Sequence, residues 1–83
     1  MNSAVKVLFF AALRERTDTK ELWVSIEEGI RARDLLRCLQ NVYPQIKQLL
    51  PRVRVAVNQK ITEMDQLLFD GDEIALIPPV SGG

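Results

Sequence analysis

Hydrophobic and polar residues alternate in four stretches of the chain, which is the pattern of strands with one buried face. The stretches cover residues 4–11, 20–26, 52–57 and 73–77, and residues 60–62 form a short returning arm after the two-residue turn Asn58-Gln59. The residues predicted to face the core are Val5, Val7, Phe9, Leu22, Val24, Ile26, Val53, Val55, Val57, Ile74 and Leu76.

Apolar residues at helical spacing predict one main helix from about Arg31 to Tyr43. Its core-facing stripe comprises Ala32, Leu35, Leu36, Leu39, Val42 and Tyr43, and its solvent side carries Arg31, Arg33, Arg37 and Gln40. No Ser, Thr, Asp or Asn stands at the expected cap, and Pro44 ends the helix. Residues 11–16 predict a short second helix, and residues 45–50 predict a short turn.

The order of these elements predicts an α+β fold. Two terminal hairpins enclose one helix, so the first and last strands lie side by side in the centre of the sheet, as in a β-grasp. We expect this domain to span residues 1–77 and a C-terminal tail to span residues 78–83. The first strand also carries Leu8 and Phe10 on its outer face, and because a chain this short provides one layer of helix, we expect them to form an exposed patch for a partner.

Eleven basic and eleven acidic residues cancel, so the chain lacks the positive charge typical of a nucleic-acid-binding domain. The charges are unevenly distributed, because all eleven basic and six acidic residues precede residue 61, whereas five acidic residues and no basic one follow. From this asymmetry we expect the tail to leave the domain from an acidic patch. Either a basic docking surface on a partner or a solvated acidic edge accounts for such a patch.

The chain has no histidine and one cysteine, Cys38. An internal disulfide and a Ser-His or Cys-His catalytic pair are therefore excluded, and a zinc site would lack its usual ligands. Cys38 lies beside the helical stripe and is interpreted as a half-buried structural thiol. Asp70, Asp72 and Glu73 flank Gly71 and are interpreted as a turn, with a metal cluster as the weaker alternative, because the ligand series of a calcium loop is missing.

Trp23 falls on the more polar face of the second strand, where we expect a partly exposed side chain. No apolar run approaches the length of a membrane span, and the N-terminus lacks the pattern of a signal peptide. A cytoplasmic location is the expectation that follows.

The chain ends in two prolines and two glycines, Pro78-Pro79-Val80-Ser81-Gly82-Gly83. The prolines stop ladder pairing and favour an extended exit, and two residues without a Cβ pass through a channel too narrow for a side chain. A Gly-Gly end by itself is also consistent with an artificial or frayed terminus. If the end is natural, the reactive group is the α-carboxylate of Gly83, which a partner enzyme reaches unhindered.

Four segments carry a resemblance to a known family, namely residues 6–11 (Lys-Val-Leu-Phe-Phe-Ala), 56–59 (Ala-Val-Asn-Gln), 70–75 (Asp-Gly-Asp-Glu-Ile-Ala) and 77–83 (Ile-Pro-Pro-Val-Ser-Gly-Gly). They resemble the small, sulfur-carrying subunit of molybdopterin synthase (MoaD type), a ubiquitin-like β-grasp protein, over the whole chain. The resemblance implies that a ubiquitin-activating-like adenylyltransferase uses ATP to convert the Gly83 carboxylate to an acyl adenylate. A persulfide donor then supplies the sulfur of a thiocarboxylate.

The same resemblance implies the partners and the site residues. The tail, with Pro78, Pro79, Val80 and Ser81, inserts into the large synthase subunit, Gly82 gives clearance, and Gly83 carries the sulfur. There the sulfur attacks cyclic pyranopterin monophosphate, and repeated delivery builds the dithiolene of molybdopterin. Phe10, Ile61 and Ile77 occupy the apolar positions of the large-subunit contact. Two small and two large subunits, no stably bound cofactor or metal, and no nucleic-acid or membrane partner are implied as well.

Three alternatives remain at this point. The thiamine-pathway sulfur carrier shares the Gly-Gly end but usually lacks the Pro-Pro-Val approach to it. A ubiquitin-like modifier would form an isopeptide bond with a target lysine. A β-grasp interaction module with an inert tail would lose no activity when Gly82 and Gly83 are removed.

Overall fold

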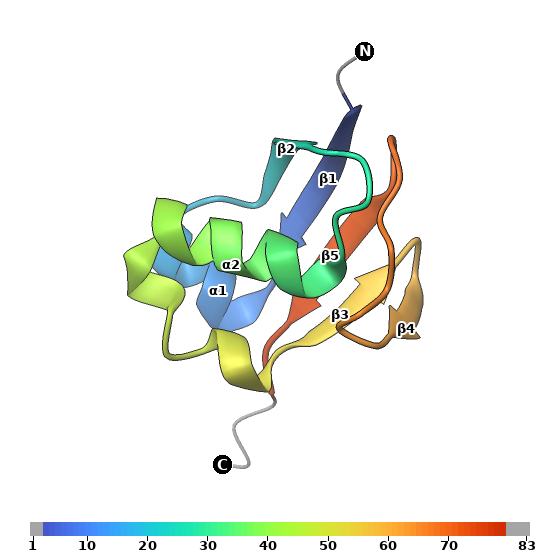
Figure 1. The fold of residues 1–83 in the computed structure, drawn as a ribbon. Helices are drawn as coiled ribbons and strands as arrows, with labels where there is room; N and C mark the ends of the chain where they lie inside the picture. The colour runs from blue at the N-terminus through green and yellow to red at the C-terminus, as the bar shows by residue number, and fades with distance from the viewer. Residues whose placement is uncertain (1–2, 80–83) are drawn as a thin grey trace.

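A computed structural model describes residues 3–79 of the chain. One five-stranded sheet carries both α-helices and two short 3₁₀ helices (Figure 1). The elements are β1 (Ser3–Phe9), α1 (Ala11–Thr17), β2 (Glu21–Ile26), α2 (Ala32–Val42), η1 (Pro44–Ile46), η2 (Leu50–Arg52), β3 (Arg54–Val57), β4 (Lys60–Thr62) and β5 (Glu73–Ile77).

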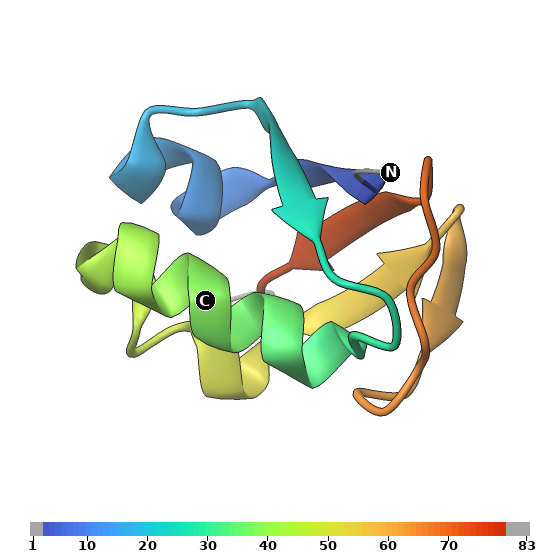
Figure 2. The same ribbon diagram turned by 45° about the horizontal axis from the view of Figure 1, so that its top comes forward.

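The strand order is β2-β1-β5-β3-β4, with β1 and β5 parallel at the centre and the other pairs antiparallel. This arrangement confirms the predicted β-grasp. Because β1 and β5 are parallel, their C-terminal ends lie side by side at the same end of the sheet, where Phe9 pairs with Leu76. α2 crosses one face of the sheet, which we call the inner face, and no helix of the described chain crosses the other, outer face (Figures 1 and 2).

The core lies between α2 and the inner face of the sheet. The predicted inward residues of β1, β3 and β5 are buried, whereas Leu22 and Val24 of β2 are only partly buried because β2 is an edge strand. Val42 was predicted to face the core but is 64% exposed. Tyr43, which was predicted on the same stripe, follows the end of α2 and does pack against the core, where its ring meets that of Phe9 edge-to-face at 5.6 Å between centroids.

The start of α2 shows how a helix without a capping side chain satisfies its first N–H groups. The N–H of Ala32 donates to the carbonyl of Gln66 at 2.9 Å, and that of Arg33 to the carbonyl of Met64 at 2.8 Å. The Asp34 carboxylate accepts the N–H of Arg31 at 2.9 Å. The segment between β4 and β5 therefore caps α2, which explains the missing cap residue.

The turns follow from residues that tolerate a positive φ. Asn58 and Gln59, with φ of 52° and 70°, form the predicted two-residue turn between β3 and β4. Gly71, with φ of 85°, forms the turn that leads into β5. Both turns lie at the end of the sheet where β5 begins. The C-terminal end of β5, from which the chain continues, lies at the opposite end of the sheet.

Thr62 on β4 is a site where a substitution should raise stability. Its hydroxyl oxygen is buried without a hydrogen-bond partner among residues 3–79, and such a group costs about 1–3 kcal/mol. Thr62→Val is expected to raise the free energy of unfolding by about 1 kcal/mol, measured by urea denaturation. Val55→Thr, opposite Thr62 on β3, is the control and should lower it. A less stable Thr62→Val would show that the hydroxyl has a partner.

Candidate functional site

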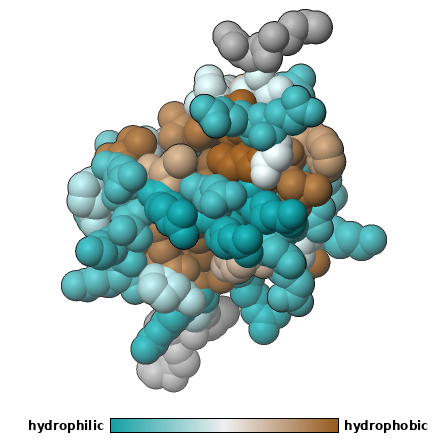
Figure 3. Space-filling model, viewed as in Figure 1, coloured by the Kyte–Doolittle hydropathy of each residue, from teal (hydrophilic) through white to brown (hydrophobic). Residues whose placement is uncertain are grey.

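A shallow apolar hollow lies on the outer face of the sheet, over β1, β5, β3 and β4. We call it the outer patch. Its lining comprises the apolar Leu8, Phe10, Ala56, Ile61, Ala75 and Ile77 and the polar Gln59 and Glu73. Strand alternation produces it, because the side chains between the buried ones point away from α2. By contrast, hydrophilic side chains form a broad band across the helix-bearing side of the molecule (Figure 3).

Phe10, Ile61 and Ile77 are the most exposed apolar residues of the outer patch, with exposed fractions of 45%, 53% and 37%. The structure thus brings the three predicted contact residues around one hollow, and their role in binding a partner stays a prediction. Leu8, Ala56 and Ala75 line the same hollow and were not among the predicted site residues. Their outward alternation was visible in the sequence, but only the register of β3 against β5 and of β1 against β5 places them together.

The backbone holds Phe10 firmly at the end of β1. Its carbonyl accepts the N–H of Leu13 at 3.0 Å and the N–H of Arg14 at 3.4 Å, which starts α1 immediately after the strand. Ala11 supports this abrupt change of direction with a φ of 48°, a value that a residue with a Cβ seldom adopts. Since Phe9 pairs with Leu76, Phe10 lies next to Ile77, where β5 ends.

The chain leaves the sheet after Ile77. Pro78 is buried and Pro79 is exposed. Pro78 was predicted to contact a partner as part of an extended strut, but its apolar ring packs into this domain, so only Pro79 of the two prolines is accessible. Val80, Ser81, Gly82 and Gly83, the other residues of the predicted tail site, lie outside the described residues.

The charges around this exit differ from the expectation. Asp70, Asp72 and Glu73 lie where β5 begins, whereas the chain leaves where β5 ends, and the first and last residues of this five-residue strand are about 14 Å apart. The prediction that the tail leaves from an acidic patch is therefore wrong, because the acidic residues close in sequence to the tail are separated from it by the length of β5. A basic docking surface on the partner was inferred from this acidic patch, so that inference no longer has support.

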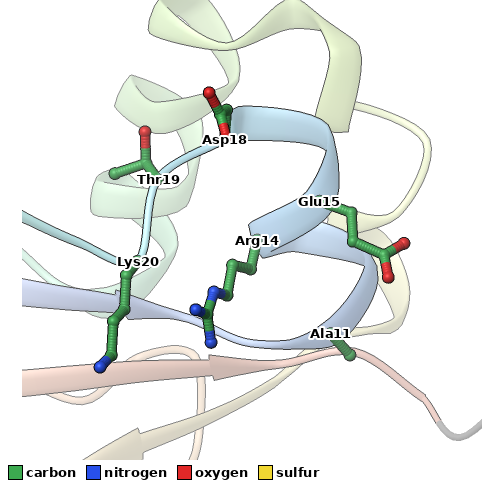
Figure 4. Close-up of a pocket in the computed structure, with 6 residues that line it drawn as sticks. All are labelled: Ala11, Arg14, Glu15, Asp18, Thr19 and Lys20. Carbon is green, nitrogen blue, oxygen red and sulfur yellow. The ribbon is translucent and has the colours of Figure 1, made fainter.

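Residues of both charges lie at the end of the sheet where the chain leaves it. Arg54 pairs with Ile77 across β3 and β5, and the carbonyl of Lys20 accepts the N–H of Phe9 at the end of β1. The side chains of Arg14 and Lys20 extend in the same direction beside a hollow along α1, and the acidic Glu15 and Asp18 line the same hollow (Figure 4).

The acidic turn before β5 performs a structural task. The Asp72 carboxylate accepts the side-chain N–H of Asn58 at 2.9 Å and the backbone N–H of Phe69 at 2.8 Å, and Asp70 accepts the N–H of Ala4 at 2.9 Å. These bonds tie the turn to the β3–β4 hairpin and to β1. Among residues 3–79 no group of three or more His, Cys, Asp or Glu side chains is arranged to hold a metal ion.

Removing the Asp72 carboxylate should destabilise the fold. Asp72→Ala leaves two donors without their acceptor, and we expect the free energy of unfolding to fall by about 2 kcal/mol in a urea titration. Asp65→Ala is the matched control, because the guanidinium of Arg31 binds the backbone carbonyl of Asp65, which this change keeps. Equal stability of the two variants would show that the turn does not depend on Asp72.

Cys38 and Trp23 both lie at the surface of the domain. Cys38 is exposed, not half-buried, because it lies on the flank of α2 outside the stripe that packs on the sheet. Trp23 is 60% exposed, as its place on the polar face of the second strand predicted. No helix in residues 3–79 has the length and apolar character needed to cross a lipid bilayer.

A mixed sheet with parallel central strands, one main helix across its inner face and an apolar patch on its outer face is the architecture of a ubiquitin-like β-grasp domain. Comparison with known proteins gives the family. The profile of the ThiS family matches residues 7–83, so the chain belongs to this family. The resemblance to molybdopterin synthase sulfur carrier subunits that the sequence predicted is confirmed as well.

One such relative is the molybdopterin synthase sulfur carrier subunit of Mycobacterium tuberculosis, 42% identical over 95% of this chain and 96% of its own length. Among solved structures, the small archaeal modifier protein 1 of Methanosarcina acetivorans has a TM-score of 0.84 and 32% identity over 100% of this chain and 99% of its own. The complex of subunits 1 and 2 of the molybdopterin-converting factor of Helicobacter pylori contains a chain with a TM-score of 0.69 and 26% identity, covering 96% of this chain and 99% of its own.

Proposed function

We propose that this chain is the sulfur carrier subunit of molybdopterin synthase, a sulfurtransferase complex, and that it carries the sulfur on the terminal carboxyl group of Gly83. The observation that carries the proposal is the family match, which runs through residue 83 and so includes the Gly-Gly end. The near full-length identity to curated sulfur carrier subunits supports the same function. The chain has no histidine, so it acts as a substrate of its partners and contributes its own terminus to the reaction.

The carboxylate of Gly83 needs activation before it accepts sulfur, because its leaving group would be oxide. An adenylyltransferase resembling ubiquitin-activating enzymes transfers AMP from ATP to the carboxylate and releases pyrophosphate. The sulfur of a persulfide donor then attacks the carbonyl carbon and AMP leaves. The carrier is then linked to the donor through a disulfide bond. A thiol reduces this bond and so frees the thiocarboxylate. ATP is consumed by this partner, and no cofactor needs to stay bound to the carrier.

The thiocarboxylate transfers its sulfur in the large synthase subunit. The chain that begins at Pro79 enters the large subunit, where the sulfur forms a C–S bond with a carbon of cyclic pyranopterin monophosphate as a C–O bond of that carbon breaks and its oxygen leaves. Water then cleaves the bond between the acyl carbon and the sulfur, which returns the carboxylate. A second loaded carrier repeats the transfer, which completes the dithiolene. The Helicobacter pylori complex of subunits 1 and 2 supports a large-subunit partner, and we place this contact on the outer patch, around Phe10, Ile61 and Ile77.

The mass of the intact protein tests the first half of this proposal. The chain is incubated with ATP, the activating enzyme and a persulfide donor, and the expected product has one oxygen replaced by sulfur, mapped to Gly83 by fragmentation. The reaction without ATP is the control and leaves the mass unchanged. An unmodified terminus under conditions that load the Mycobacterium tuberculosis relative contradicts the proposal.

A second candidate function is that of a ubiquitin-like modifier. The likeness to small archaeal modifier protein 1, at 32% identity over the whole chain, favours it. A modifier joins its terminal carboxyl group to lysine side chains, so blots of cell extract would show a ladder of conjugates that disappears in a chain without the Gly-Gly end. A thiamine-pathway carrier would be distinguished by the acceptor of its sulfur, because it would not transfer sulfur to cyclic pyranopterin monophosphate.

A further inference from the structure

Trp23 is the largest exposed apolar side chain that the outer patch leaves unexplained. It lies on β2 opposite Lys6 of β1, and residues paired in this way point to the same face of a sheet. Because Lys6 and Leu8 alternate with the buried Val5 and Val7, this is the outer face. Trp23 therefore stands on the same surface as the outer patch, one strand beyond its edge.

The register makes the apolar surface continuous from the outer patch to Trp23. Leu8, a lining residue of the outer patch, lies opposite Glu21, so Trp23 is its diagonal neighbour across β1 and β2. Diagonal neighbours in an antiparallel pair are about 7–8 Å apart, within reach of an aromatic side chain. With Trp23 included, apolar residues span the outer face over all five strands.

Two charged residues, Lys6 and Glu21, lie between Leu8 and Trp23, but they do not prevent a partner from binding over this surface. Lys6 Nζ lies 3.3 Å from Glu21 Oε2, so the two charges at this crossing neutralise each other. An ion pair that is already formed is covered by a partner at lower cost than a single unpaired charge. Phe69 and Val42 are exposed to a similar degree as Trp23. They lie on the segment before β5 and at the end of α2, so they are not part of the outer face.

We propose that the surface that binds the large synthase subunit extends from the outer patch across β1 to β2, and that Trp23 is a second anchor of this interface. The proposal rests on the proposed function, and it adds a contact at the edge of the sheet to the one around Phe10. Tryptophan is among the residues that contribute most to binding when a partner covers them in an apolar pocket. The large subunit is thus expected to present an apolar pocket flanked by polar groups that face Lys6 and Glu21.

The chain has one tryptophan, which makes the test specific. Fluorine-labelled tryptophan in the small subunit gives a single fluorine NMR resonance. On addition of unlabelled large subunit we expect this resonance to move and its solvent isotope shift, measured between light and heavy water, to fall toward zero. A complex in which the resonance and its isotope shift stay unchanged overturns the proposal, because Trp23 would then still be in contact with water.

Two variants test the energetic part. Trp23→Ala is expected to weaken binding of the large subunit at least about 30-fold, whereas Phe69→Ala, which removes an equally exposed aromatic ring elsewhere, should stay within about twofold of wild type. Unfolding midpoints of both variants verify that they fold. If wild type binds and Trp23→Ala binds equally well, this proposal fails alone. If wild type does not bind the large subunit at all, the proposed function fails with it.

Discussion

A chain that lacks Gly83 will fold as wild type does and will not deliver sulfur. The core consists of residues between Val5 and Leu76, so removing one terminal residue leaves it intact. The new terminus, Gly82, ends about 3.5 Å short of the reacting position, and a misplacement of about 1 Å already reduces a rate about 100-fold. We therefore expect sulfur transfer to fall at least about 100-fold, measured in a single turnover with the large subunit, while the unfolding midpoint stays unchanged.

Substitutions at Gly82 distinguish the need for a residue without a side chain from the need for a tail of a certain length. Gly82→Ala and Gly82→Val keep the number of residues and add side chains of increasing size, so transfer should fall in that order if the terminus passes through a narrow channel. Ser81→Ala is the matched control, because it removes a hydroxyl and adds no bulk. Full activity of the shortened chain would contradict the role of Gly83 directly, and full activity of Gly82→Val would contradict the channel.

Phe10→Glu will strongly weaken binding of the large subunit without unfolding the domain. Phe10 is 45% exposed at the end of β1, so a polar side chain is tolerated in the free chain. In the complex the carboxylate would be buried in an apolar interface, and the loss of a central anchor costs about 2–4 kcal/mol, or about 30-fold to 1000-fold in affinity. Isothermal titration with the large subunit measures this loss.

A matched charge elsewhere distinguishes the site from a general effect. Phe69→Glu adds the same charge in place of an exposed aromatic ring on the segment before β5, away from the outer face, and should bind normally. Ile77→Lys, next to Phe10 at the end of β5, should repeat the loss with a charge of opposite sign. Normal binding by both Phe10→Glu and Ile77→Lys would show that the partner contacts a different face.

Local pattern was sufficient to predict most of the sheet. In β5 the alternation of Ile74 and Leu76 with Ala75 and Ile77 gave both the strand and its two faces, because a strand repeats every two residues. The turn at Asn58 was predictable for a similar reason, since few residues tolerate a positive φ. These features depend on neighbours in sequence, and the structure confirms them.

What the sequence did not predict depends on residues far apart in the chain. The cap of α2 comes from the carbonyl groups of Met64 and Gln66, about thirty positions further on, and no local motif announces it. The acidic residues before β5 are close in sequence to the tail, yet the extended strand places them at the opposite edge. The burial of Pro78 is likewise a matter of packing, which composition does not reveal.

If the terminus of this chain is the sulfur donor, the sulfur can be followed from Gly83 to the pterin. Chain loaded with radiolabelled sulfur at Gly83 is mixed with the large subunit and cyclic pyranopterin monophosphate in a single turnover. We expect each sulfur lost from the chain to appear on the pterin and the terminus to return to a carboxylate. Label that stays on the chain, or that leaves it without reaching the pterin, would show that Gly83 is not the sulfur donor.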